Sequence, residues 1–426
     1  MTEAAANPTD AQQQIERNFR WNFLVNTVDG TFFSFGISFF SSKIILPLFV
    51  SHYTSSPLVI GLITFLGWSG VLLPQVFMAN IIERAPRKKF FAVNLGFFLE
   101  RLPLLLLPLA VYFLAVDYPL ATLIIFFALY GWHNFGAGII IVGWQDLIAK
   151  VIPTERRGRF FGISNFLGYG MGILGALAVP LLLDRNPFPR GYVIAFSITG
   201  VCVFLSWVML SLTREPAVAS AKAPVSQAEY LRSLPEILRK DRNFRSFLLA
   251  QIISALSGMA GGFLVIYSAE RWNLPDAQAS AFMIALQVGL AVAFLFFGFL
   301  ADRKGHKLIL EICFLSNFAL LLLAIAAPGP LWFYPIFFLS GAVQAGNILS
   351  GFAIVYEFTA AETRPTYIGL ANTIPGIGVT VAPLIGGWLA GAVGYRAMFT
   401  AALVLAAASW LLLRFTVREP RAAAKV

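Results

Sequence analysis

Long apolar stretches recur along the entire chain of 426 residues, and they limit its fold more than any other feature. Twelve runs of 18 or more mostly apolar residues can be counted, and a helix needs about 20 such residues to cross a bilayer. Hydrophobic residues make up 58% of the chain and charged residues only 12%, whereas about a quarter of a soluble domain is charged. The chain is therefore predicted to be an all-α membrane protein with twelve transmembrane helices.

The basic residues are distributed unevenly between the two sides of the predicted membrane. Of the 31 Lys and Arg residues, 25 fall at the termini and in the loops after helices 2, 4, 6, 8 and 10. Four fall on the opposite side and two lie within predicted spans. Because basic loops stay in the cytoplasm, both termini are predicted to be cytoplasmic. The net charge of +10 thus sets orientation, and no nucleic-acid partner is expected.

A tight polar hairpin separates two of the apolar runs in the second half of the chain. Gly298 is followed by Asp302, Arg303, Gly305 and Lys307, and Gly305 is predicted to let the chain turn back. This order of residues resembles the G-x-x-x-D-R-x-G-R-K signature of the major facilitator superfamily, which lies between helices 8 and 9. His306 stands where the signature has Arg.

A degenerate copy of this hairpin follows helix 2. Glu83 aligns with Asp302 and Arg84 with Arg303, while Pro86 replaces the loop glycine. The resemblance implies that the two hairpins latch the cytoplasmic side when the transport cavity opens outward. The predicted cytoplasmic gate residues are Glu83, Arg84, Gly298, Asp302, Arg303, Gly305 and Lys307.

The second half of the chain repeats the first. Arg17-Asn18-Phe19-Arg20 recurs as Arg242-Asn243-Phe244-Arg245, and the hairpin recurs at an offset of 219 residues. The resemblance implies two pseudo-symmetric six-helix bundles with a substrate site between them near the membrane midplane. The predicted segments are a cytoplasmic tail (1–16), an N-terminal bundle (17–213), a cytoplasmic linker (214–241), a C-terminal bundle (242–417) and a second cytoplasmic tail (418–426).

Two ionisable residues inside predicted spans are candidates for proton coupling. Asp29 lies on a polar stripe of helix 1, and an ionisable group in a span normally faces the protein interior or an aqueous cavity. The alternative for Asp29 is a structural ion pair with Arg101 or Lys43. His133 in helix 4 is either a proton relay or a satisfied core histidine.

The predicted substrate cavity is lined by helices 1, 4, 7 and 10, as the resemblance implies. Arg101 is either an anion-binding residue or part of a structural charge network, and it is expected to point away from its neighbour Glu100, because adjacent helical residues diverge. The cavity candidates are Asn26, Phe33, Trp68, Arg101, Tyr130, Asn134, Gln251, Gln287, Gln344 and Asn347.

These features predict a secondary active transporter of a small organic solute that works by alternating access. The chain contains no G-x-x-x-x-G-K-[ST] loop, so an ion gradient is the expected energy source, with proton coupling and export favoured. Neither an enzymatic activity, a cofactor nor a metal site is expected. Two alternatives are a lysolipid-handling transporter on the same fold and a ligand sensor or scaffold that does not transport. The expected location is a bacterial inner membrane, with the protein a monomer in the lipid bilayer.

Overall fold

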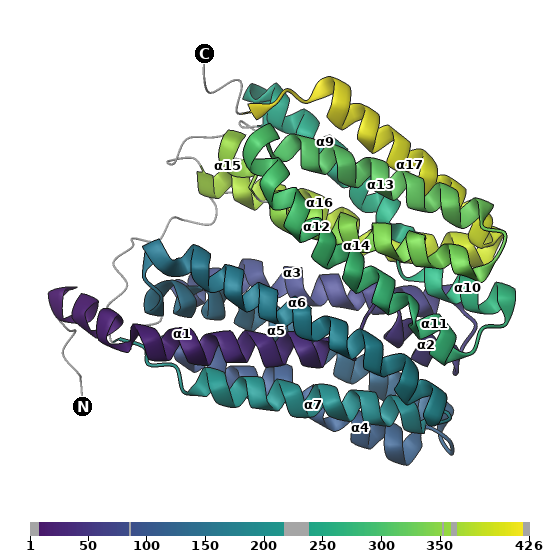
Figure 1. Cartoon of the computed structure of the whole chain (residues 1–426), viewed down its shortest axis with the longest axis horizontal. Coiled ribbons are helices and arrows are strands. Elements are labelled where there is room, and N and C mark those ends of the chain that lie inside the picture. The colour runs from purple at the N-terminus through teal and green to yellow at the C-terminus, as the bar shows by residue number, and fades with distance from the viewer. Residues whose placement is uncertain (1–7, 85–86, 217–237, 352, 359–363, 421–426) are drawn as a thin grey trace. The chain divides into compact units, whose positions relative to one another are not determined.

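The computed structural model of the chain describes residues 8–84, 87–216, 238–351, 353–358 and 364–420. Within these ranges the regular structure is helical, without a strand (Figure 1). Ten of the described helices are long and apolar enough to cross a membrane. Helices α1 (Pro8–Ser38) and α14 (Phe333–Ser350) correspond to the remaining two predicted spans, and their polar stripes lower their hydropathy. The predicted all-α membrane fold is confirmed.

The chain divides into two compact units. Unit 1 consists of Met1–Ser41 and Leu66–Pro224, and unit 2 of Ser42–Phe65 and Val225–Val426. The division differs from a simple halving, because residues 42–65 follow the first helix in sequence but pack with the second half of the chain. Helix α3 (Pro57–Arg84) therefore contributes its first turns to unit 2 and its remainder to unit 1.

Unit 1 is a bundle in which α1 packs against two later helices (Figure 1). These are α6 (Thr154–Arg185) and α7 (Arg190–Ser211). The third predicted span has an unusual start, because Phe90–Leu95 and Phe97–Arg101 form π-helical turns before α4 (Leu102–Leu114) continues as an ordinary helix. Helix α5 (Pro119–Val151) packs against α4 and both π-helical stretches.

The first predicted span is broken into two helices. The apolar pattern predicts one helix from about Trp21 to Val50, but α1 ends at Ser38 and a separate helix α2 runs from Ile45 to Ser51. Proline at position 47 has no N–H to donate to the carbonyl of Lys43, so a continuous helix would lose that hydrogen bond. The break places Lys43 in an irregular turn.

Unit 2 contains the helices of the second half. The first span of the second half is also interrupted, as is the first span of the chain. Helix α9 (Arg242–Ser257) gives way to a short 3₁₀ turn (Gly258–Ala260) and then to α10 (Phe263–Trp272). The remaining helices are α11 (Asp276–Ser280), α12 (Phe282–Lys304), α13 (His306–Ala326), a 3₁₀ turn (Pro330–Trp332), α14, α15 (Val355–Phe358), α16 (Arg364–Val393) and α17 (Tyr395–Thr416).

The first turns of α3 are held in unit 2 by close backbone contacts with α16 at one glycine of each helix. A side chain at Gly387 would meet the carbonyl of Pro57 at 2.7 Å, and a Cβ at Gly61 would meet the carbonyl of Pro383 at 2.6 Å. Small residues let membrane helices approach this closely. The contacts explain why residues 57–65 belong to unit 2.

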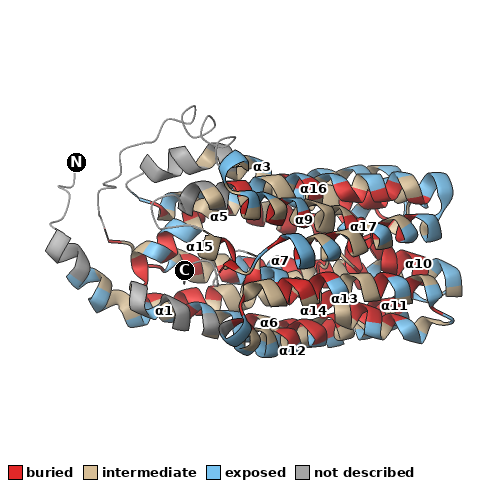
Figure 2. Ribbon diagram, turned by 90° about the horizontal axis from the view of Figure 1, so that it is seen from above, coloured by how far each residue is buried: buried red, intermediate tan, exposed pale blue. Residues whose placement is uncertain are grey.

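Buried and exposed residues alternate along the same helices (Figure 2). Many large apolar side chains on the outer faces are exposed, including Phe166 at 77% and Phe299 at 67%. In a membrane protein such side chains face lipid tails, so their exposure carries no penalty. Buried polar residues, by contrast, need partners inside the protein. Asp29, Glu100, Arg101 and His133 are buried in this way within unit 1.

Helices α12 and α14 approach each other very closely in unit 2, and this contact gives a stability prediction. A Cβ at Gly289 would overlap with the carbonyl oxygen of Phe338, which is backbone and cannot rotate away. We expect Gly289→Ala to lower the free energy of unfolding by about 1–3 kcal/mol, because the helices must separate. The control is Gly170→Ala, where no atom lies within 4 Å and alanine should be neutral or slightly stabilising. Thermal unfolding in mild detergent measures both, and equal midpoints would contradict the prediction.

Candidate functional site

The polar stripe of α1 lies in the interface with α7. Asp29 is 4% exposed, and Ser206 Oγ donates to its Oδ1 over 2.5 Å. One turn away, Thr213 Oγ1 donates to Asn26 Oδ1 over 3.3 Å. Thr199 Oγ1 donates to the carbonyl of Gly36 further along the same face. The stripe therefore places Asp29 inside unit 1, where the Ser206 hydroxyl donates directly to its carboxylate.

Glu100 and Arg101 lie beside this carboxylate in the π-helical part of the third span. The Arg101 guanidinium interacts electrostatically with Asp29 and lies over the ring of Phe33, with 5.6 Å between its Cζ and the ring centroid. Contrary to the expectation from an ordinary helix, Arg101 Nη1 also pairs with the carboxylate of Glu100. The wider π-helical turn changes the direction of successive side chains and lets these two long ones converge.

His133 completes this group from α5. Its Nδ1 lies 2.9 Å from the carbonyl oxygen of Glu100, and because a carbonyl only accepts, Nδ1 carries the proton in this contact. His133 is 6% exposed, and its ring contacts that of Phe40 edge to face. Asp29, Phe33, Arg101 and His133, which the sequence selects separately, are thus brought together within unit 1.

The other candidates of unit 1 lie close to α3 or on the surface. Tyr130 and Asn134 are buried on α5, where the side chain of Asn134 donates to the carbonyl of Tyr130 over 2.7 Å. Both pack against glycines of α3: a Cβ at Gly67 would meet Tyr130 Oη at 2.9 Å, and one at Gly70 would meet Asn134 Cβ at 2.7 Å. Trp68 on α3 is 45% exposed and takes no part in these contacts.

Four cavity candidates belong to unit 2. Gln251 on α9 and Gln287 on α12 are partly buried, and Asn347 on α14 is exposed. Gln344, one turn before Asn347, accepts a hydrogen bond from Lys43 Nζ over 3.0 Å. The structure thus pairs Gln344 with a lysine that the sequence associates with the first helix.

A cluster that the sequence interpretation missed lies at one end of unit 1. Glu215 directly follows the last span of the unit, and its two carboxylate oxygens accept the backbone N–H groups of Lys88 and Lys89, each over 2.9 Å. Lys150 Nζ also donates to Glu215 Oε1 over 2.9 Å, and Lys88 Nζ lies 3.3 Å from Asp146. Burial lowers the pKa of Lys89, and the Glu215 carboxylate opposes that shift. We call these five residues the charged end of unit 1.

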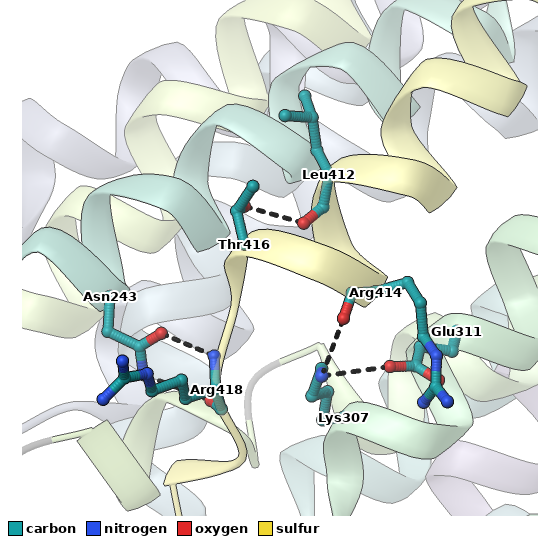
Figure 3. Close-up of polar contacts among 7 residues, drawn as sticks. All are labelled: Asn243, Lys307, Glu311, Leu412, Arg414, Thr416 and Arg418. Atoms are coloured by element: carbon teal, nitrogen blue, oxygen red, sulfur yellow. Dashed lines mark hydrogen bonds and ion pairs between the residues drawn. The ribbon is translucent and has the colours of Figure 1, made fainter.

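A corresponding cluster joins α13 to α17 in unit 2 (Figure 3). Lys307 Nζ lies 3.1 Å from Glu311 Oε1, and Arg414 Nη1 lies 3.2 Å from Glu311 Oε2. Nearby, Tyr367 donates to Asp241 over 3.0 Å, and burial together with this carboxylate raises the pKa of Tyr367 to about 12. We call Asp241, Lys307, Glu311, Tyr367 and Arg414 the charged end of unit 2.

The predicted gate residues are only partly described. Gly305 has φ of 91°, which confirms the predicted turn, and a Cβ there would lie 2.8 Å from Glu419 Oε1. Gly298 lies within α12. Arg303 is exposed, whereas Lys307 bonds within the charged end of unit 2. The side chains of Glu83, Arg84 and Asp302 lie outside the described residues, although their helices are described.

In each unit, one asparagine side chain makes two hydrogen bonds to the backbone just after the last span. Asn22 accepts from the N–H of Arg214 over 2.8 Å and donates to the carbonyl of the same residue over 3.0 Å. Asn243 makes the same two bonds with Arg418, over 2.8 and 3.1 Å. The sequence signal for these contacts is the triplet Arg-Glu-Pro, which occurs at 214–216 and again at 418–420.

The helices and the asparagine hydrogen bonds are repeated in the two units. Comparison with known proteins tests whether this arrangement belongs to a known family. The sequence profile of the Major Facilitator Superfamily matches residues 30–270 and again residues 247–426. The chain belongs to the major facilitator superfamily. This superfamily consists of membrane transporters, and the chain is accordingly a multi-pass membrane protein of the transporter class.

Curated relatives of this superfamily are similar at modest identity. The multidrug resistance protein MdtG from Salmonella choleraesuis (strain SC-B67) is 26% identical over 287 residues, which cover 65% of this chain and 69% of the relative. An uncharacterized MFS-type transporter, MJ1317 from Methanocaldococcus jannaschii, is 25% identical over 390 residues, covering 87% of this chain and 89% of the relative.

Solved structures of major facilitator proteins share the fold. A point mutant of the nucleoside transporter NupG matches with a TM-score of 0.70 at 14% identity, covering 92% of this chain and 98% of that protein. A D-xylose–proton symporter matches with a TM-score of 0.69 at 13% identity, covering 95% and 99%. At such identities the likeness establishes the architecture and leaves the solute open.

Proposed function

We propose that this chain is a proton-coupled secondary transporter that exports a small organic solute by alternating access. The observation that carries the proposal is the Asp29 carboxylate, buried within the predicted first span beside Ser206 and Arg101. Ionisable groups in such positions mark ion pathways and proton relays. The likeness to MdtG, a multidrug resistance protein, supports export.

Charge balance within the cluster supports Asp29 as the proton-binding residue. Glu100 and Arg101 neutralise each other through their ion pair, so ionised Asp29 leaves the described cluster with one net negative charge. Binding of one proton cancels that charge. Since net charge inside a membrane protein is costly, protonated and ionised states will favour different conformations, which is the requirement for coupling. His133 is then the neighbouring group through which a proton reaches or leaves the cluster.

The same proposal includes the orientation and location of the chain. The placement of 25 of the 31 basic residues supports cytoplasmic termini. The likeness to MdtG of Salmonella supports a bacterial inner membrane. The charged ends of units 1 and 2 then lie at the cytoplasmic surface. The proposal also takes the chain to act as a monomer, since a single polypeptide supplies both units.

A proton-flux measurement tests the proposal. The purified chain is reconstituted into liposomes that contain the pH dye pyranine, and lipophilic cations, neutral sugars, organic anions and lysolipids are added outside in separate experiments. We expect the inward gradient of at least one solute class to drive proton movement across the membrane. Liposomes without protein should give no response. Solute movement without proton movement would overturn coupling. The absence of both would favour a sensor or scaffold.

A further inference from the structure

Lys43 places a positive charge deep in unit 2. Its Nζ donates to Gln344 Oε1 over 3.0 Å. Gln344 lies eleven residues after Phe333, where α14 begins, and at 1.5 Å per residue this corresponds to about 17 Å along the helix. That is more than half of a hydrocarbon core about 30 Å thick. The partly buried ammonium group of Lys43 therefore lies near mid-membrane depth, well away from the start of α14.

The charge of Lys43 has a neutral partner. Among the residues that the structure describes, no carboxylate lies within ion-pairing distance of its Nζ. The described acidic groups of unit 2 pair elsewhere, for example Glu311 with Lys307 and Asp276 with His52. A buried or partly buried cation at this depth is ordinarily compensated by an anion. Lys43 thus differs from Arg101, which has Glu100 and Asp29 beside it.

The surroundings of Lys43 provide further hydrogen-bonding groups. Ser340 and Asn347 lie four residues before and three residues after Gln344, on the same face of α14. The Oε1 atom of Gln344 accepts from Lys43, so the Nε2 group of the same amide still carries two N–H donors. One ammonium and one adjacent amide can donate together to the two oxygens of a single carboxylate.

We propose that Lys43 and Gln344 bind the carboxylate of the transported solute, which is an organic monoanion. This inference rests on the proposed transport function and names its substrate class. A single cation fits a monoanion, whereas a phosphate dianion would leave one charge uncompensated. Because Lys43 is held by α14 while Asp29 lies inside unit 1, solute binding and proton binding occupy different units.

The test uses matched pairs of soluble probes with the full-length chain in mild detergent. Each pair contains a carboxylate and its uncharged primary amide, such as dansylglycine with dansylglycinamide and 2-naphthoate with 2-naphthamide, alongside medium-chain fatty acids and their amides. We expect carboxylates to bind the wild type more tightly than amides. Lys43→Gln should weaken carboxylate binding about 10- to 100-fold and leave amide binding within about twofold, as expected for loss of a hydrogen bond to a charged group. Lys43→Arg should retain the preference.

Controls separate this inference from the proposed function and from misfolding. Arg396→Gln removes one exposed positive charge from unit 2 and should leave both affinities unchanged. Equal binding of carboxylates and amides by the wild type, equal losses for both in Lys43→Gln, or a response to lysolipids alone would overturn the inference. So would failure of every soluble carboxylate to bind. If solute-driven proton flux nevertheless occurs with neutral solutes, the transport function stands and only the substrate class is wrong.

Discussion

Asp29→Asn is expected to abolish solute-driven proton movement while leaving the fold intact. Asparagine has the same shape and keeps an oxygen that can accept from Ser206 Oγ, but it cannot bind and release a proton. In pyranine-loaded liposomes the variant should give the signal of empty liposomes. Exchange of labelled for unlabelled solute should persist. In exchange the carrier changes conformation in both directions with solute bound, so no net proton transfer is needed.

Asp184→Asn is the matched control for this experiment. Asp184 lies near the end of α6 and is exposed, so the same change of side chain should leave proton flux at the wild-type level. Wild-type proton flux in Asp29→Asn would show that the carboxylate has a structural role only. Loss of exchange together with proton flux would instead indicate that the substitution disturbs the solute site or the α1–α7 interface.

Glu215→Ala is expected to cause the largest loss of stability among single substitutions outside the membrane. It removes the acceptor of two backbone N–H groups and the partner of Lys150, all at 2.9 Å, at a site where the Glu215 side chain is 4% exposed. Two buried N–H groups lose their acceptor and Lys150 loses its pairing with this carboxylate, and removing one partner of a buried pair costs about 3–5 kcal/mol. Thermal unfolding of unit 1 in mild detergent should show the loss.

Two further variants identify the cause of the Glu215 effect. Glu215→Gln keeps one acceptor oxygen and removes the charge, so its loss should be smaller, about 1–3 kcal/mol. Asp117→Ala removes an exposed carboxylate from unit 1 and should change stability by no more than about 0.5 kcal/mol. If Glu215→Ala unfolds at the same temperature as Asp117→Ala, the charged end of unit 1 does not stabilise the unit.

The architecture could be predicted from sequence because the length and hydropathy of each apolar run are read directly from its residues. Runs of about 20 apolar residues must become helices in a bilayer, and the repeated hairpin pointed to two related halves. The break between α1 and α2 was missed because Pro47 lies within an apolar stretch, where hydropathy gives no signal. The assignment of residues 42–65 to unit 2 depends on contacts with residues far along the chain, such as Gln344 and Gly387, and periodicity within one helix does not report such contacts.

The sequence predicted which residues belong to the candidate site better than it predicted which of them contact one another. Asp29, Arg101 and His133 were selected because ionisable groups are rare in spans, and the structure gathers them in unit 1. The pairing of Glu100 with Arg101 was predicted wrongly, because the π-helical turns that redirect the side chains have no clear sequence signature. Glu215 was missed because it was assigned to a linker, although its Arg-Glu-Pro triplet recurs at 418–420.

The membership of residues 42–65 in unit 2 has a consequence for biosynthesis. These residues enter the membrane early, yet the partner of Lys43 lies 301 residues later and that of His52 lies 224 residues later. Contacts between segments so distant form late, because the intervening chain must first be made and inserted. A nascent chain halted after the sixth span would thus hold α2 and the first turns of α3 without their native neighbours. Such truncated chains should be protease-sensitive at 42–65 and more resistant within α5 to α7.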